Sequence, residues 1–498
     1  MISAFSNIFK VPELRERILF TLAMIVVARI GAVIAIPGIN VGVLNAYFAD
    51  RAAADSGATV LTLLNLFSGG ALEQCAIFYL GIMPYISASI IMQMMKAVIP
   101  RLNKLEREDG GRQKIQQYTR YLTLFLCVFQ GYFFSLTLVH PQANSFLPGI
   151  TDTIDQLGTP LVSMDPTFFI PICVLVITAG SLMLMWIGDQ ITERGVGNGT
   201  SLIITISIVA ALPGALIQAW RTFVGSGDAG DERLSPILLV MMIAFLLFVI
   251  AAVIAITQAQ RKVTVQYAKR VVGRKVYGGQ TQFLPLKVNY AGVMPIIFAQ
   301  ALLLFPATIV SFVFPESDMA EGMANFITTG WFFYVFMAAM IFFFSYFWVA
   351  MQFQPAQIAD DLKKAGGYIP GIRPGKATSD FLDYTMSRLT FAGAFFLAII
   401  AVMPQSLQQI ASIPYLPASF FGGTSLLIIV GVVLDAMRQI ETHLIQRHYD
   451  GFLRKGRIRG RFDRAVQTGN AASGSLLIWL YAGIGILIII GVAVFFAQ

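Results

Sequence analysis

Charged residues are scarce in this chain. Asp, Glu, Lys and Arg make up 12% of its 498 residues, whereas hydrophobic residues make up 56%. A soluble globular domain usually carries about 25% charged residues, so the composition excludes an ordinary soluble protein. Cysteine is rare as well, and Cys75, Cys127 and Cys173 all lie in apolar stretches, which gives no basis for a disulfide framework. The composition predicts a protein that places most of its length in a membrane.

Residues suited to catalysis or metal binding are equally sparse. The histidines are His140, His443 and His448, and none lies in an apolar run beside a carboxylate or a serine. An intramembrane hydrolase is therefore disfavoured, because it needs a nucleophile–base pair. The stretch from Gly375 to Thr378 resembles the end of a phosphate loop but lacks its spaced upstream glycine. We expect no enzymatic activity, no catalytic residues, no metal and no cofactor.

Long apolar runs dominate what is present. A hydrocarbon core about 30 Å thick is crossed by roughly 20 apolar residues in a helix. Because backbone groups in lipid must be paired internally, such runs are expected to be helices. Ten spans are predicted at 18–37, 76–97, 120–139, 168–187, 199–219, 236–256, 288–314, 331–353, 385–404 and 420–440, with an additional one at 476–496. The expected fold class is an all-α polytopic membrane protein.

Loop charges set the expected orientation. Lys96–Arg120 and Gln258–Lys287 each hold seven Lys or Arg residues, whereas 140–167 and 314–330 hold none. Positive loops stay in the cytoplasm, so the alternating bias predicts a cytoplasmic N-terminus.

Ten spans divide into two halves of five. Because five is odd, the second half enters the membrane in the opposite orientation to the first. This arithmetic predicts an inverted repeat, an arrangement common in transporters. The predicted divisions are an N-terminal half, 1–225, and a C-terminal half, 226–450, with cytoplasmic loops at 257–287 and 354–384. Residues 451–498 are predicted to form a basic tail and the additional C-terminal helix.

Because inverted repeats are common in transporters, an ion-coupled small-solute carrier is the alternative function. Carriers of that kind usually place carboxylates or paired ions in mid-membrane. Here the charges within the spans are few, namely Arg29, Arg388 and Asp435. We expect these charges to have structural partners, with Arg438 pairing with Asp435, and the scarcity of carboxylates favours a channel.

A short apolar segment, 60–72, precedes the second span. It is too short to cross the membrane, and segments of this length are usually re-entrant or interfacial. Its polar and flexible residues include Asn65, Ser68, Gly69 and Gly70. We expect it to lie on the outer side of the membrane, lined by protein or water.

Several long blocks then carry a family signal. They are NLFSGGAL (65–72), GIMPYISASI (81–90), GRQKIQQYTRY (111–121), GDQITERGVGNGTSLII (188–204), YAKRVVGRKVYGGQTQFLPLKVNYAGVMPIIFA (267–299), DLKKAGGYIPGIRPGKAT (361–378) and FGGTSLLI (421–428). In these blocks the chain resembles the SecY family, the central subunits of the bacterial protein-conducting channel. The resemblance implies a channel in the bacterial cytoplasmic membrane that translocates unfolded secretory polypeptides and releases apolar helices into lipid. The implied partners are SecE, SecG, the SecA motor or the ribosome, signal peptides and membrane lipid.

The resemblance also implies a pore between the halves, closed by a ring of apolar side chains. The ring residues would be Ile82, Ile86, Thr200, Ile204, Ile297 and Ile428. Ile82 and Ile86, like Thr200 and Ile204, are four residues apart and share a helix face. An apolar constriction excludes water and ions by dewetting. Thr200 departs from the family pattern, which has an apolar residue there, and the bland alternative for the isoleucines is ordinary packing.

Segment 60–72 matches the family's plug, with Asn65, Phe67, Ser68, Gly69 and Gly70 as its expected residues. The implied lateral gate lies between the second and third spans and the seventh and eighth. Ser87 and Gln130 are its expected polar residues, and the alternative is that they only hold helices together.

The basic loops match the surfaces where family members meet the ribosome or SecA. The expected docking residues are Lys269, Arg270, Arg274, Lys275 and Arg373. Ribosomal RNA offers phosphates, for which arginine is a bidentate donor. The alternative is that these charges only enforce topology.

Overall fold

The computed structural model describes residues 12–53, 65, 68–108, 110–141, 149–223, 236–267, 270–272, 275–277, 281–313, 331–411 and 415–454. Helices dominate this part of the chain, and seven of them are long and apolar enough to cross a membrane. The all-α character and the multi-pass membrane class are thereby confirmed. The count of ten spans and the inverted repeat stay predictions, and the additional span at 476–496 lies outside the described residues.

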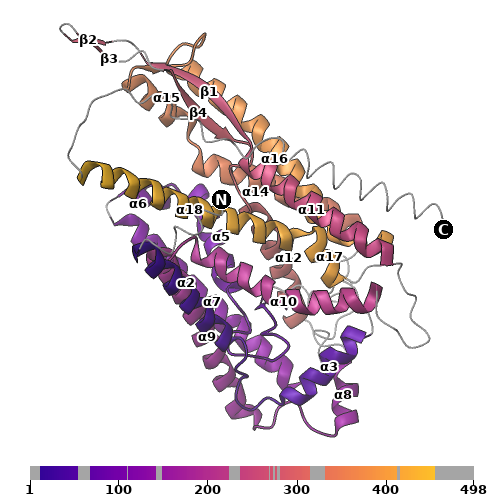
Figure 1. Cartoon of the computed structure of the whole chain (residues 1–498). Coiled ribbons are helices and arrows are strands. Elements are labelled where there is room, and N and C mark those ends of the chain that lie inside the picture. Colours follow the sequence, from indigo (N-terminus) through magenta and orange to yellow (C-terminus); the bar gives the residue numbers. More distant parts are fainter. Residues whose placement is uncertain are drawn as a thin grey trace.

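The helices of the predicted N-terminal half occupy one side of the molecule in Figure 1. They are α2 (Pro12–Gly31), α3 (Val41–Ala53), α5 (Met83–Val98), α6 (Pro100–Arg107), α7 (Gly111–Val139), α8 (Ile150–Leu157), α9 (Pro166–Arg194) and α10 (Gly199–Phe223).

The helices of the predicted C-terminal half lie beside the first set. They are α11 (Pro236–Gln258), α12 (Met294–Val313), α14 (Trp331–Gln352), α15 (Pro355–Lys364), α16 (Lys376–Ala411), α17 (Tyr415–Gly422) and α18 (Thr424–Arg454). The two sets meet through α5 and α7 against α12, and through α10 against α17 and α18.

Each of the ten predicted spans overlaps a long helix, but two of the predicted starts are too early, and the first span, predicted to end at residue 37, ends as a helix at Gly31. The span predicted from residue 76 begins as a helix only at Met83, with Pro84 in its first turn, where a missing N–H costs least. The residues before it form turns, and Ala76 pairs with Ala35 in an isolated bridge. The span predicted from residue 288 begins as a helix at Met294, also followed by a proline.

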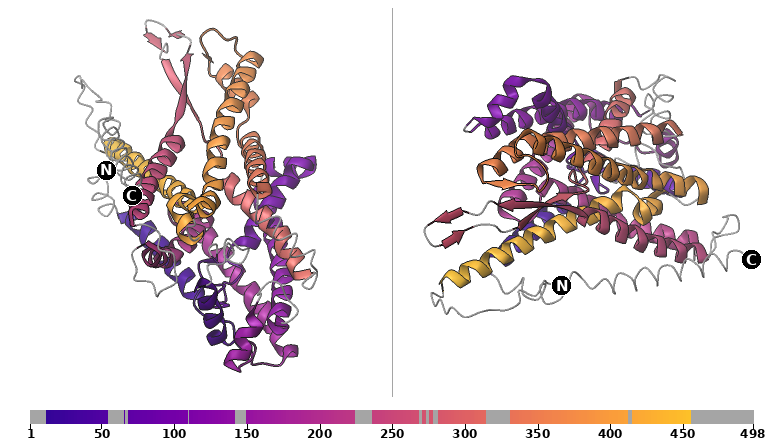
Figure 2. Two further views of the ribbon diagram at one scale, coloured as in Figure 1. Left: turned by 90° about the vertical axis from the view of Figure 1, so that its right-hand side faces the viewer. Right: turned by 90° about the horizontal axis from the view of Figure 1, so that it is seen from above.

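Strands appear where the sequence predicted only basic loops. They are β1 (Gln260–Tyr267), β2 (Arg270–Val272), β3 (Lys275–Tyr277), β4 (Thr281–Lys287) and β5 (Gly367–Tyr368). β1 is the middle strand of a three-stranded antiparallel sheet, with β4 on one side and β5 on the other. Figures 1 and 2 show this sheet alongside α15 and α16, with the β2–β3 pair beyond its outer end. The two predicted cytoplasmic loops are therefore joined by main-chain hydrogen bonds.

One large apolar core runs through the helices of both sets. It draws buried side chains from α5, α9, α10, α11, α12, α14, α16 and α18. A second core, beneath α3 and α8, packs Tyr79 against Phe134, whose ring centroids are 3.6 Å apart. A third core fixes the base of the sheet to α14 and α16. The large core holds most of the expected ring residues.

Candidate functional site

Five of the six expected ring residues are buried together. Ile82 is the N-cap of α5. The other four lie within helices: Ile86 in α5, Ile204 in α10, Ile297 in α12 and Ile428 in α18. Each is at most 5% exposed. Thr200, in the first turn of α10, is only half-buried. The same core contains other isoleucines, so shared burial places these side chains together without by itself assigning them a role.

The end of the expected plug segment forms a compact, hydrogen-bonded turn. The main-chain oxygen of Asn65 accepts hydrogen bonds from the Ser68 hydroxyl and the Gly70 N–H, each at 3.1 Å. The Ser68 oxygen in turn accepts from the N–H of Leu72 at 3.3 Å. Phe67 lies outside the described residues.

Glu73 anchors this turn from its far end. The side-chain amide of Asn65 donates to Glu73 Oε1 at 2.6 Å. Burial raises the pKa of the Glu73 carboxyl, and the hydrogen bond from Asn65 opposes that effect. The carboxylate thus serves as a local acceptor for the turn.

Arg29 of α2 reaches the same turn. Its Nη1 donates to the main-chain oxygen of Gly69 at 3.0 Å. Arg29, Ser68 and Ile82 line one small cavity, together with residues of α9 and α10. The charge that the sequence left unexplained therefore has a structural partner, as we expected, and that partner is a backbone carbonyl rather than a carboxylate.

The helices of the expected lateral gate meet through α12, which packs directly against both α5 and α7. Ser87 of α5 is buried and Gln130 of α7 is half-buried. Within the described part of the chain, neither side chain forms a hydrogen bond. The contact of α12 with α5 and α7, called the gate seam below, therefore rests on apolar packing.

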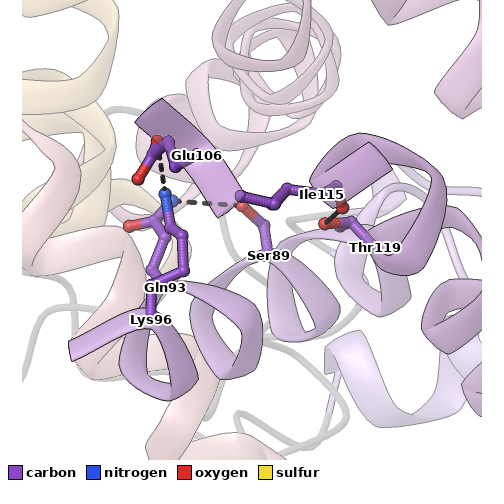
Figure 3. A network of polar contacts seen from close by, with 6 residues as sticks. All are labelled: Ser89, Gln93, Lys96, Glu106, Ile115 and Thr119. Atoms are coloured by element: carbon purple, nitrogen blue, oxygen red, sulfur yellow. Dashed lines mark hydrogen bonds and ion pairs between the residues drawn. The ribbon is translucent and has the colours of Figure 1, made fainter. Parts of the chain in front are cut away.

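The polar contacts of α5 lie toward its C-terminal end. Figure 3 shows Lys96 of α5 facing Glu106 of α6, with their charged atoms 3.0 Å apart. Beside them the Gln93 amide donates to the Ser89 hydroxyl at 3.2 Å. The Lys96–Glu106 pair fastens α5 to the neighbouring short helix, the Gln93–Ser89 hydrogen bond lies within α5, and neither involves α12.

The expected docking residues fall on two separate parts of the structure. Arg373 is exposed in a turn between Gly371 and Gly375, both with positive φ, and the Thr378 hydroxyl donates to its carbonyl oxygen at 2.9 Å. Arg270 and Lys275 lie in β2 and β3, which pair with each other. Lys269 and Arg274 lie outside the described residues.

One site escaped the sequence analysis, the loop between α9 and α10. Its main-chain groups are held from three directions and are called the 195–199 clamp below. The Val196 N–H donates to Thr21 Oγ1 of α2 at 3.1 Å, and the Gly197 N–H donates to Gln439 Oε1 of α18 at 2.8 Å. The Gly199 N–H donates to Thr192 Oγ1 at 2.9 Å. The sequence signal that could have indicated this site is the run of glycines at 195, 197 and 199.

The other two intramembrane charges have different outcomes. The Arg388 guanidinium lies 4.7 Å from the ring centroid of Tyr384. The expected pairing of Asp435 with Arg438 is wrong, because Arg438 instead donates to the carbonyl oxygen of Thr257 at 3.2 Å. Asp435 is exposed on its helix.

Known proteins match this chain over most of its length. The family model SecY matches residues 76–437. "Protein translocase subunit SecY" of Chlamydia muridarum is 42% identical over 459 residues, covering 91% of this chain and 99% of the relative. The protein of the same name from Thermotoga maritima is 39% identical over 463 residues, covering 93% of this chain and 100% of the relative.

Solved structures share the fold at lower identity. "The structure of a protein conducting channel" matches with a TM-score of 0.55 and 16% identity, covering 88% of this chain and 94% of that one. "Sec61 in the Canine ribosome-channel complex from the endoplasmic reticulum" matches with a TM-score of 0.52 and 14% identity over the same shares. The matched family region starts after the hydrogen-bonded turn and reaches into α18, and it therefore includes every expected ring and gate residue. The chain belongs to the SecY family.

Proposed function

We propose that this chain forms a conduit through which unfolded secretory polypeptides cross a membrane, and from which apolar helices pass sideways into lipid. Relatives about 40% identical over nine-tenths of the chain are translocase subunits by name, which supports this class of function. The chain acts as a channel subunit, and its energy comes from a partner.

The observation that carries the proposal is the family match over residues 76–437, which includes Ile82, Ile86, Ile204, Ile297 and Ile428, together with the burial of these side chains in one core. These side chains come from four helices, two in each predicted half. A waist of branched apolar side chains seals against water and ions by dewetting. It also yields to a passing chain, because no hydrogen bond or ion pair has to break. Thr200, half-buried in the first turn of α10, is the sixth residue of the proposed waist.

The segment containing Asn65, Phe67, Ser68, Gly69 and Gly70 serves as the plug that closes the conduit. Its support is the hydrogen-bonded turn between Asn65 and Leu72, which borders the same cavity as Ile82. The solved-structure relative described as "The plug domain of the SecY protein stablizes the closed state of the translocation channel and maintains a membrane seal" has a TM-score of 0.54 to this chain.

The gate seam is the sideways exit. A signal helix moving through it from water into lipid gains about 25 cal/mol per Å² of apolar area buried. Because Ser87 and Gln130 have no hydrogen bond to break within the described residues, opening the seam costs mainly packing.

The cytoplasmic sheet and the Arg373 turn form the docking surface, with Arg270 and Lys275 on β2 and β3. Lys269 and Arg274 are proposed for the same surface from the sequence alone. Its partners are the SecA motor or the ribosome, and SecE and SecG complete the membrane complex. The chain lies in the bacterial cytoplasmic membrane with its N-terminus in the cytoplasm. The basic loops at 257–287 and 354–384 support this orientation.

The ion-coupled carrier is the weaker reading. A carrier needs charges in mid-membrane that are free to bind and release an ion. Arg29 and Arg388 are instead engaged by Gly69 and Tyr384.

Cross-linking of an arrested secretory precursor tests the proposal. Photo-reactive probes at Ile86 and Ile297 are expected to capture the precursor. A probe at Leu175, which is 69% exposed on α9, is the matched control and is expected to capture lipid. Equal capture at all three positions, or displacement of the precursor by a small solute, would contradict the conduit.

A further inference from the structure

Arg29 lies in a largely apolar environment. It belongs to the last turn of α2, and its neighbours around the small cavity include Ile25, Ala28 and Phe78. A guanidinium in such a place is costly unless its donors are used. Among the described residues its hydrogen-bond partner is the Gly69 carbonyl oxygen, 3.0 Å from Nη1.

Gly69 fits its place closely. Its φ of +68° lies in the left-handed region, which favours glycine. A Cβ at this position would stand 2.6 Å from Arg29 Nη1 and 2.8 Å from the Cα of Ser207. The turn is therefore seated in a slot between α2 and α10, with the guanidinium forming one wall.

We propose that Arg29 is a positioning residue for the plug: its guanidinium holds the Gly69 carbonyl and so keeps the 65–72 turn in its closed seat. The inference rests on the plug role proposed above. Two contacts that do not involve Arg29, from Asn65 to Glu73 and from Ser68 to Asn65, shape the turn itself. Arg29 is the described side chain that ties the shaped turn to a membrane helix through a hydrogen bond.

The chemistry suits a reversible hold. A charge-assisted hydrogen bond is about twice as strong as a neutral one, so a single contact can bias the closed state. When a polypeptide displaces the turn, water entering the conduit can accept from the freed donors, which limits the cost of opening. Because arginine stays protonated at all ordinary pH values, the hold does not switch with pH.

Ion leak through the reconstituted, complete membrane complex tests this inference. Arg29→Met removes the donor but keeps a long side chain, and we expect roughly a tenfold rise in resting conductance across a planar bilayer. Arg29→Lys retains a cation and a donor, and we expect it to restore much of the seal. The same conductance in Arg29→Met as in the unaltered chain would overturn the inference.

A matched glycine pair gives a second, independent measurement. Gly69→Ala and Gly70→Ala both place a side chain at positive φ, but only Gly69→Ala drives a Cβ into Arg29 and Ser207, since nothing lies within 4 Å of a Cβ at Gly70. We expect a larger leak from Gly69→Ala than from Gly70→Ala. Equal leaks would contradict a specific seat at Gly69.

Deletion of 60–70 separates this inference from the plug proposal. If the deletion itself causes no leak, the plug proposal fails, and the inference falls with it. If the deletion leaks and Arg29→Met adds nothing in that background, Arg29 acts through the plug. If Arg29→Met lowers the melting temperature equally with and without residues 60–70, its role is general packing, and the positioning role is overturned.

Discussion

The predicted halves meet at two seams of opposite chemistry. At the gate seam, α12 packs against α5 and α7, and Ser87 and Gln130 contribute no hydrogen bond among the described residues. At the 195–199 clamp, the Gly197 N–H donates to Gln439 of α18 in the other half, while Thr21 of α2 accepts from the Val196 N–H within the same half. The first seam is apolar, and the second contains a hydrogen bond from a main-chain N–H.

This difference indicates which seam is able to part. Two apolar helix surfaces can separate and contact lipid instead, because lipid tails are as apolar as the side chains they replace. A buried N–H that loses its acceptor instead keeps the full cost of its desolvation. We therefore expect the clamp to act as the fixed side, about which the gate seam opens.

Gly199→Ala is expected to break the clamp most severely. A Cβ on Gly199 would overlap the carbonyl oxygen of Gly188, so the ends of α9 and α10 would be forced apart. Overpacking of this kind typically costs about 1–3 kcal/mol, and more where only backbone can move. Thermal unfolding of the detergent-solubilised complex measures the loss.

Gly188→Ala is its control at the same contact. There the nearest atom, Cδ1 of Ile203, would lie 3.4 Å from the new Cβ, an ordinary distance. A loss of stability in Gly188→Ala as large as that in Gly199→Ala would show that the close approach is unimportant.

Gln439→Leu is expected to have the next largest effect. It removes the acceptor of the Gly197 N–H and leaves a buried donor unpaired, at a cost of about 1–3 kcal/mol. Gln439→Glu keeps an acceptor oxygen and should retain most of the stability. If both variants unfold at the same temperature, the hydrogen bond to Gly197 does not stabilise this seam.

Ser87→Ala is expected to have the smallest effect, within about 0.5 kcal/mol of the unaltered chain. Ser87 is buried in the gate seam but breaks no described hydrogen bond when its hydroxyl is removed. Chemical denaturation of the same complex gives the comparison. A cost equal to that of Gln439→Leu would erase the distinction between the two seams.

Apolar length predicted the helices well, because a membrane helix needs little more than an unbroken apolar run. The rule failed where apolar residues form turns instead of a helix, as they do before Met83 and Met294. The sheet was missed for a different reason. Its pairing of Gln266 with Tyr368 joins segments about a hundred residues apart, and no local pattern marks such a register.

The candidate site shows the same division. The resemblance named the ring isoleucines, and the structure buries them together. Arg29 was conspicuous as an unexplained charge, but its partner is a main-chain carbonyl, which leaves no signature in the sequence. The pairing of Asp435 with Arg438 failed for a related reason, since Arg438 also takes a main-chain carbonyl.

The β1–β4 ribbon continues almost without interruption from α11, and residues 288–293 connect its other strand to α12. β1 begins two residues after α11 ends, its ladder runs down to Gln260 and Lys287, and the Val288 N–H donates to the Ala259 carbonyl oxygen at its base. A ribbon fastened in this way is a stiff arm, whose root continues into α11 and, through residues 288–293, into α12. A force applied to the tip of the ribbon in the cytoplasm would be transmitted to α12, the helix that forms the gate seam with α5 and α7.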